Sequence, residues 1–289
     1  GGARAALLAG AGLLAVYVLV ALACDPAGFL RTDTGGKVAT LRAMDAGDTG
    51  VPDIGYWAED RDPAGDLHPL YYTARLGDRW VNVTTLPALY AGYPLYRAGG
   101  YRAVLLVPML GAVAAAFAAR ALARRLRPSS TGWMPFWLAG LASPLAVYAL
   151  DFWEHSLGVA AMGWASVFAL DVALSTAGDA TDARGATTGP RAAGMIVRAG
   201  LAGGLFGVAA TMRTEAIVYG GVIVALALVA ATARRVRRPA RRVGRIAVLV
   251  GAAGAAAALA FVVPLALNNA LERAVLGQPL RADRAQAAV

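Results

Sequence analysis

Residues 5–24 read AALLAGAGLLAVYVLVALAC, a stretch that contains no charged side chain. An α-helix rises about 1.5 Å per residue, so a run of about 20 apolar residues crosses the hydrocarbon core of a bilayer. A second such run, residues 246–267, reads IAVLVGAAGAAAALAFVVPLAL. These two stretches predict membrane-spanning helices, and five further ones follow the same rule. They are residues 103–122, 133–150, 156–174, 195–212 and 216–233.

The composition agrees with a membrane protein. The chain is 58% hydrophobic and 16% charged, whereas soluble domains carry about 25% charged residues. Cys24 is the single cysteine, which excludes an internal disulfide and a multi-cysteine zinc site. The net charge is +9, but the arginines gather in short runs between apolar stretches. This pattern is typical of topology signals, and we expect no nucleic-acid partner.

The arginine bias predicts the orientation, because cytoplasmic segments are enriched in Lys and Arg. One cluster lies at the end of the second predicted span and in the segment after it (Arg120, Arg124, Arg125, Arg127), and a larger one occupies residues 234–245. With seven spans, both clusters and the linker 178–191 are cytoplasmic, as is the N-terminus. The opposite face receives the loop 25–102, residues 151–155, the turn 213–215 and the tail from residue 268. Most remaining ionisable residues therefore lie on the extracytoplasmic face.

The long first loop opens with TDTGGK at residues 32–37. Asp33 stands where a helical pattern of apolar residues begins (Val38, Leu41, Met44), and a helix N-terminus favours the ionised carboxylate. Lys37, one turn further on, is a candidate phosphate contact. The alternative is that Asp33 only caps the helix, a role that the neighbouring threonines fill equally well.

Residues 80–100 are aromatic and are interrupted by Pro87 and Pro94. This composition predicts a pair of interfacial helices, with an ordinary covering loop as the alternative.

The corner between the third and fourth predicted spans contains Asp151, Glu154 and His155. Asp151 and Glu154 are spaced to share one helix face, and ionisable groups near membrane depth are usually functional. A solvated corner or a metal site are the alternatives, although the only other histidine is His68 in the first loop.

Arg213 and Glu215 stand between two short apolar segments that are together too long for one crossing. Arg213 is a candidate for a bidentate phosphate contact. A salt bridge between Arg213 and Glu215 is the alternative.

Taken together, these features resemble the GT-C superfamily of polytopic glycosyltransferases, and most closely its members related to protein mannosyltransferases and lipid-A aminoarabinose transferases. The resemblance rests on four places: Asp33 in TDTGGK, the stretch 77–94 (GDRWVNVTTLPALYAGYP), the residues 152–155 (FWEH), and Asn268-Asn269 followed by LGQP at 276–279. In protein mannosyltransferases an adjacent acidic pair opens this loop, whereas Asp33 is followed by Thr34. Relatives continue beyond the seventh span, which leaves open whether these residues are the N-terminal part of a longer protein.

The resemblance implies a fold and a chemistry. The fold is an all-α polytopic membrane protein with a seven-helix GT-C-type module over 1–289 and a long extracytoplasmic first loop carrying interfacial helices. The activity is transfer of a sugar from a polyprenyl-phosphate donor to a glycan, lipid or protein hydroxyl at the outer face of the plasma membrane. Asp33 is the expected catalytic base, and Lys37 and Arg213 are the expected donor-phosphate contacts. Asp151, Glu154, His155, Glu215, Asn268 and Asn269 are the expected supporting contacts to donor or acceptor.

No resident cofactor is expected, and a divalent cation is possible without being indicated by the sequence. A small-molecule or lipid transporter is the main alternative function. It predicts internal repeats and ionisable groups at mid-span, and the sequence has neither. A lipid scaffold built on Gly/Ala-rich helices is the third reading.

Overall fold

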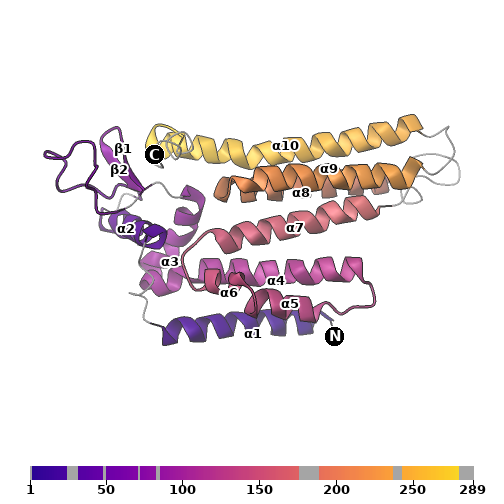
Figure 1. Cartoon of the computed structure of the whole chain (residues 1–289), viewed down its shortest axis with the longest axis horizontal. Helices are drawn as coiled ribbons and strands as arrows, with labels where there is room; N and C mark the ends of the chain where they lie inside the picture. The colour runs from indigo at the N-terminus through magenta and orange to yellow at the C-terminus, as the bar shows by residue number, and fades with distance from the viewer. Residues whose placement is uncertain are drawn as a thin grey trace. The chain divides into compact units, whose positions relative to one another are not determined.

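The computed structural model describes residues 2–24, 32–47, 50–70, 72–82, 85–175, 189–236 and 243–279. Within these ranges the regular secondary structure is helical apart from one two-stranded hairpin (Figure 1). The chain forms two compact units. The first contains Gly1–Val113, Gly140–Leu157 and Leu267–Val289, and the second contains Ala114–Ala139 and Gly158–Ala266.

Six of the described helices are long and apolar enough to cross a membrane, which confirms a polytopic all-α protein. They are α1 (Gly2–Ala23), α4 (Leu106–Leu126), α7 (His155–Leu174), α8 (Gly189–Met212), α9 (Glu215–Val236) and α10 (Val243–Leu276). The predicted sharp break between the fifth and sixth spans is also confirmed, because α8 ends at Met212 and α9 begins at Glu215.

The prediction of one continuous helix over 133–150 is wrong. This stretch forms two short helices, α5 (Trp133–Leu141) and α6 (Pro144–Ala149). Proline disfavours a helical conformation in the residue before it, and Ser143 precedes Pro144 in an extended conformation. The Ser143 side chain accepts a hydrogen bond from the Leu145 amide, so it caps a new helix.

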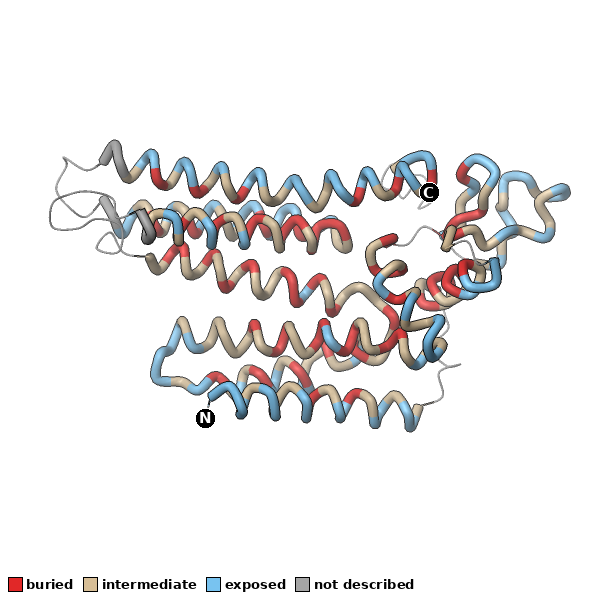
Figure 2. Tube along the Cα trace, turned by 180° about the vertical axis from the view of Figure 1, so that it is seen from behind, coloured by how far each residue is buried: buried red, intermediate tan, exposed pale blue. Residues whose placement is uncertain are grey.

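In the first unit, α1 makes few contacts for its length. Only Leu13 and Tyr17 are buried, and the remaining surface is largely exposed in Figure 2, as expected of a helix that faces lipid. Tyr17 donates a hydrogen bond of 2.5 Å to the carbonyl of Gly140. A side chain at Gly140 would meet Leu13, so a small residue at this position permits the close approach.

The first loop folds into three elements of the same unit: α2 (Thr32–Ala46), the hairpin β1 (Thr73–Leu76) and β2 (Arg79–Asn82), and α3 (Leu86–Val104). The hairpin is antiparallel and pairs Leu76 with Arg79 across its turn. Gly77 occupies the first turn position with a φ of 65°, the positive value that two-residue hairpin turns favour.

The prediction of a helix pair over 80–100 is wrong at its start, which is β2. From Leu86 the chain is helical through Pro94, and non-helical conformations at Gly99 and Gly100 separate this helix from a short helical segment that ends at Val104. Aromatic and β-branched residues such as Trp80 and Val81 suit a strand as well as an interface, so composition did not distinguish the two.

The helix α2 packs closely on β2 and α3. A side chain at Gly36 would lie 2.4 Å from the amide of Asn82, so the contact requires glycine at this position. Leu41 and Met44 are fully buried, and Tyr93 on α3 donates a hydrogen bond to the carbonyl of Met44. The face of α2 predicted from Val38, Leu41 and Met44 is thus its packing face.

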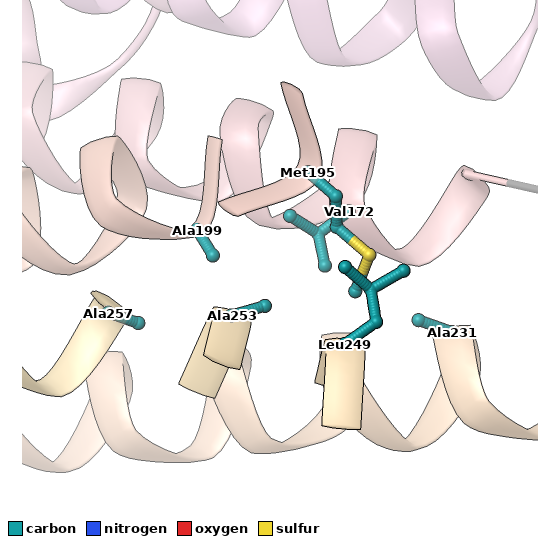
Figure 3. Packing of buried hydrophobic residues seen from close by; sticks show 7 residues of the cluster. All are labelled: Val172, Met195, Ala199, Ala231, Leu249, Ala253 and Ala257. Carbon is teal, nitrogen blue, oxygen red and sulfur yellow. The ribbon is translucent and has the colours of Figure 1, made fainter. Parts of the chain in front are cut away.

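In the second unit, α7, α8, α9 and the larger part of α10 run alongside one another (Figure 1). Seven buried residues from these four helices form one core cluster (Figure 3). They are Val172, Met195, Ala199, Ala231, Leu249, Ala253 and Ala257. A side chain at Gly203 would lie 2.0 Å from the carbonyl oxygen of Ala257, and one at Gly207 would lie 2.3 Å from that of Phe261. Small residues thus let α8 and α10 approach closely, the usual basis of helix association in membranes.

The last predicted span is longer than expected, because α10 continues to Leu276. Asn268 and Asn269 therefore belong to a helix and do not begin a tail. Most of the predicted linker 178–191 and the arginines between 237 and 242 lie outside the described residues.

Candidate functional site

The N-terminal half of α2 carries three of the residues on which the candidate site is built. Asp33 lies in the first helical turn, where a negative charge interacts favourably with the helix dipole. Thr34 and Lys37 follow three residues apart, so they share one face of the helix. Both are almost completely buried, with exposed fractions of 0% and 2%.

The second part of the site is the turn between α6 and α7, residues 150–154. Leu150 ends α6, and the amide of Trp153 donates to the carbonyl of Asp151 over 2.7 Å. These residues form a turn, so the prediction that Asp151 and Glu154 share a helix face is wrong. Their side chains nevertheless meet the same neighbour, because both contact α2.

Two polar contacts join α2 to this turn. Thr34 donates a hydrogen bond of 2.6 Å to Oδ1 of Asp151. Lys37 forms a buried ion pair with Glu154 through its Nζ and Oε2 atoms. Thr34 and Lys37 are three residues apart, as are Asp151 and Glu154. Each side chain of the helix therefore meets its own partner in the turn.

Burial and charge act in opposite directions on the two carboxylates. Burial raises the pKa of Asp151 above its ordinary value, and the hydrogen bond from Thr34 only partly offsets this effect. Burial alone would also raise the pKa of Glu154, but the charge and hydrogen bond of Lys37 hold it below the ordinary value. Asp151 is therefore the more easily protonated of the two.

Tyr101 on α3 adds a third contact. Its hydroxyl lies 3.5 Å from Oδ1 of Asp151. Burial raises the pKa of the Tyr101 phenol, and the nearby Asp151 charge raises it further, so this phenol stays protonated and able to donate. Tyr101 and Thr34 were not among the residues predicted from the sequence. A tyrosine and a threonine in a loop carry no pattern that would have singled them out.

Asp33 differs from Asp151 and Glu154. Its side chain is half-buried and forms no hydrogen bond or ion pair with any residue that the structure describes. Asp45, at the other end of α2, is paired with Arg97 at 3.3 Å. Of the two carboxylates on α2, Asp33 is thus the one that no described residue neutralises.

His155 begins α7 and is packed among aromatic rings. Its ring stacks on Tyr148 with centroids 4.6 Å apart and lies 4.9 Å from the ring of Trp153. These contacts fix the orientation of the imidazole. The neighbouring Phe152 is buried against Gly92 of α3, which anchors the turn.

The two asparagines near the end of α10 have different environments. Asn268 is buried and donates a hydrogen bond of 2.7 Å to Glu272, one turn further along the helix. Asn269 is exposed. Glu272 was not predicted, although its spacing of four residues from Asn268 is a helical signal. Nearby, Arg79 on β2 donates to the carbonyl of Val275 over 2.8 Å, so the hairpin contacts the end of α10.

Arg213 and Glu215 belong to the second unit. They form an ion pair of 2.8 Å, with side-chain exposed fractions of 36% and 54%, as the salt-bridge alternative predicts. The Arg213 side chain also lies against Gly158 in the first turn of α7, 3.5 Å from where a Cβ would stand. An exposed ion pair of this kind contributes about 0–1 kcal/mol of stability.

Among the described residues, no group of three or more His, Cys, Asp or Glu side chains is placed to hold a metal ion. The first unit offers instead two anchored carboxylates, Asp151 and Glu154, and a half-buried one, Asp33, that has no partner among the described residues. Such a group can accept a proton, bind a hydroxyl or bind a cation.

Comparisons with protein-family models, with curated proteins and with solved structures found no match. The function is therefore inferred from the chemistry of the residues themselves.

Proposed function

We propose that the protein is a membrane glycosyltransferase of the GT-C type, which transfers a sugar from a polyprenyl-phosphate donor to an acceptor hydroxyl. The observation that carries this proposal is the state of Asp33. It is the half-exposed carboxylate at the start of α2 without a partner among the described residues, on a helix fixed by Thr34–Asp151 and Lys37–Glu154.

In the proposed reaction, Asp33 accepts the proton of the acceptor hydroxyl as its oxygen attacks the anomeric carbon. A new carbon–oxygen bond forms, the bond to the phosphate oxygen breaks, and polyprenyl phosphate leaves. A general base must be unpaired to accept a proton and must be positioned within hydrogen-bond reach of it. Glu154 does not meet the first requirement because Lys37 neutralises it.

We assign Asp151, Glu154, Thr34 and Lys37 to positioning. Lys37 is buried and ion-paired, so a donor phosphate would have to displace Glu154 to reach it. The negative charge that develops on the leaving phosphate requires a cation. Arg213, the other cation predicted from the sequence, belongs to the second unit, and its phosphate contact stays a prediction that is supported by the greater exposure of its side chain than that of Lys37.

The position of the reaction at the extracytoplasmic face rests on the arginine bias and on the contacts within the first unit. Thr34 and Asp151 are in contact, so they lie on the same side of the membrane, and the chain between them must cross the membrane an even number of times. If α4 makes one of these crossings, α5 and α6 together must make the other. Gly140 contacts Tyr17, six residues before the end of α1, which places the α5–α6 break at membrane depth. Broken helices are tolerated there when other helices bury them.

The test is transfer of radiolabelled mannose or arabinose from the polyprenyl-phosphate donor by the purified protein in lipid nanodiscs. Asp33→Asn is the informative variant, because asparagine has nearly the shape of aspartate but accepts no proton. We expect it to lower turnover about 10²–10⁴-fold and to cost only about 0.3–1 kcal/mol of stability, from the lost interaction with the helix dipole.

Asp45→Asn is the matched control, since it removes the same charge from the same helix. It should leave turnover unchanged within about twofold, as exposed substitutions usually do. Absence of transfer by the wild-type protein with either donor would contradict the proposed activity. Retention of more than about a tenth of turnover by Asp33→Asn would contradict the base assignment.

A further inference from the structure

The end of α4 carries four arginines: Arg120, Arg124, Arg125 and Arg127. They differ in their partners. Arg125 donates to both oxygens of Asp171 on α7, over 2.6 and 2.9 Å, so its charge is neutralised by a bidentate pair. The other three form no ion pair with a carboxylate of the residues that the structure describes. Among the described residues, they are therefore three positive charges without a carboxylate partner.

Arg120, Arg124 and Arg127 follow one another at intervals of four and three residues, which places them on one helix face. Arg127 comes directly after the last residue of α4 and continues the helical bonding, since its amide donates to the carbonyl of Ala123. Arg124 and Arg127 are exposed.

The Arg120 guanidinium is held in place by an aromatic ring. It lies 4.0 Å over the ring of Trp133, the first residue of α5. Stacking occupies a face of the planar guanidinium and leaves its outer N–H edge able to donate. The Nε atom is buried and has no hydrogen-bond partner among the described residues.

The turn that brings Trp133 over Arg120 depends on Gly132. Its φ of 71° is a conformation that other residues rarely adopt. A side chain there would lie 2.7 Å from the Arg120 carbonyl oxygen and 3.1 Å from Cγ of Arg124. Gly132 thus packs against the stems of both arginines, and the arrangement is fixed by the fold of the α4–α5 connection (Figure 1).

An apolar surface continues from this basic face along α5. Met134, Trp137 and Leu138 are exposed by 73%, 37% and 49%. Because α4 is a candidate membrane span, its end lies at the level of lipid headgroups, with these apolar side chains available to acyl chains. Basic pockets at the ends of membrane helices are suited to anionic lipids.

We propose that Arg120, Arg124 and Arg127, with Trp133, bind the phosphate of an anionic membrane lipid. The phosphodiester accepts hydrogen bonds from the guanidinium edges, and the acyl chains lie along α5. The site is independent of the proposed transferase reaction, because none of these residues has a role in it.

The experiment titrates the purified protein in detergent with short-chain phosphatidylglycerol and follows its thermal unfolding. Phosphatidylcholine with the same chains tests whether the anionic headgroup is needed, and inorganic phosphate tests whether a free anion suffices. The main variant is Arg120→Gln/Arg124→Gln. The control is Arg102→Gln/Arg273→Gln, which removes the same charge from two exposed residues elsewhere.

We expect a saturable rise in melting temperature with phosphatidylglycerol, and no saturable rise with phosphatidylcholine or inorganic phosphate. The main variant should weaken binding about thirtyfold, from the attraction that each arginine contributes near an anionic surface. The control should bind as the wild type does. If the double variant does not fold, Arg124→Gln alone should still weaken binding, because its side chain is exposed.

Equal binding by the main variant and the wild type would overturn the proposal, and so would equal binding of the two lipids. Saturation by inorganic phosphate with the same dependence on Arg124 would overturn the lipid assignment and identify a site for free anions.

Discussion

The hydroxyl of Thr34 donates a hydrogen bond to Oδ1 of Asp151, although the two residues are 117 positions apart in the chain. Both belong to the first compact unit, as do Arg79 and Val275, which are joined by a second long-range hydrogen bond. These bonds place the first loop, the turn before α7 and the end of α10 together. The stretch 133–150, although divided into two short helices, must therefore cross the membrane if α4 does.

This relationship predicts the topology of single-cysteine variants after removal of Cys24. Cysteines at Ala64 and Ala274 should be labelled by an impermeant thiol reagent in intact cells, whereas a cysteine at Ser129 should react only after permeabilisation. All three positions are exposed. Gly65 is less suitable because a side chain there would collide with Trp80. Labelling of Ala64 and Ala274 from opposite sides would show that α5 and α6 do not cross.

The Lys37–Glu154 pair should behave as a buried ion pair. Lys37→Met or Glu154→Gln alone should cost about 3–5 kcal/mol, because each leaves a buried group without its partner. The double variant Lys37→Met/Glu154→Leu should recover much of this loss, since both charges are then absent. Thermal unfolding in detergent measures the cycle. Additive losses would show that the two side chains are not coupled.

The contributions of Glu154 and Asp151 to the stability of the fold should change in opposite directions as the pH falls. The pKa of Glu154 is lowered in the folded state, so its stabilisation is present above its unfolded pKa and is lost as the pH falls through the folded value. The pKa of Asp151 is raised, so protonation of Asp151 stabilises the fold as the pH falls through its folded value.

Unfolding should be followed as a function of pH, from neutral into the acid range, for Glu154→Gln and Asp151→Asn. The Glu154→Gln variant should be less stable than the wild type at neutral pH, with a difference that narrows in acid. Asp151→Asn should lose less stability at neutral pH, because its amide oxygen still accepts the Thr34 hydrogen bond. A difference for Glu154→Gln that widens on acidification would contradict the assigned direction of its pKa shift.

Arg213 and Glu215 can be distinguished by what each substitution changes. If Arg213 contacts the donor phosphate, Arg213→Lys should weaken inhibition by the polyprenyl-phosphate product, because lysine loses the bidentate fork. Arg213→Ala should weaken it further, and Glu215→Gln should not. Because Arg213 and Glu215 form an exposed ion pair, removing either side chain's charge should cost only about 0–1 kcal/mol of stability. Equal inhibition of all three variants would leave Arg213 with a structural role only.

The spans of the protein could be read from its sequence because each depends on a local property. A run of apolar residues with no charge has one stable place in a bilayer, and six of seven predicted spans were confirmed as candidate membrane helices. The prediction of one continuous helix over 133–150 failed because Ser143 and Pro144 interrupt it: Ser143 caps a new helix that begins at Pro144. The hairpin at 73–82 was missed because aromatic residues suit strands and interfaces equally.

For the candidate site too, some features could be predicted from the sequence and others only from the tertiary structure. The sequence identified Asp33, Lys37, Asp151 and Glu154 as unusual, since charged residues beside apolar spans are few. Only the tertiary structure decided their partners: Thr34 reaches Asp151, Lys37 is neutralised by Glu154, and Asp33 has no partner in the described residues. The apolar character of a segment is a local property and can be read from its own sequence. An ion pair depends on where two distant segments pack, and that is specified by the whole fold.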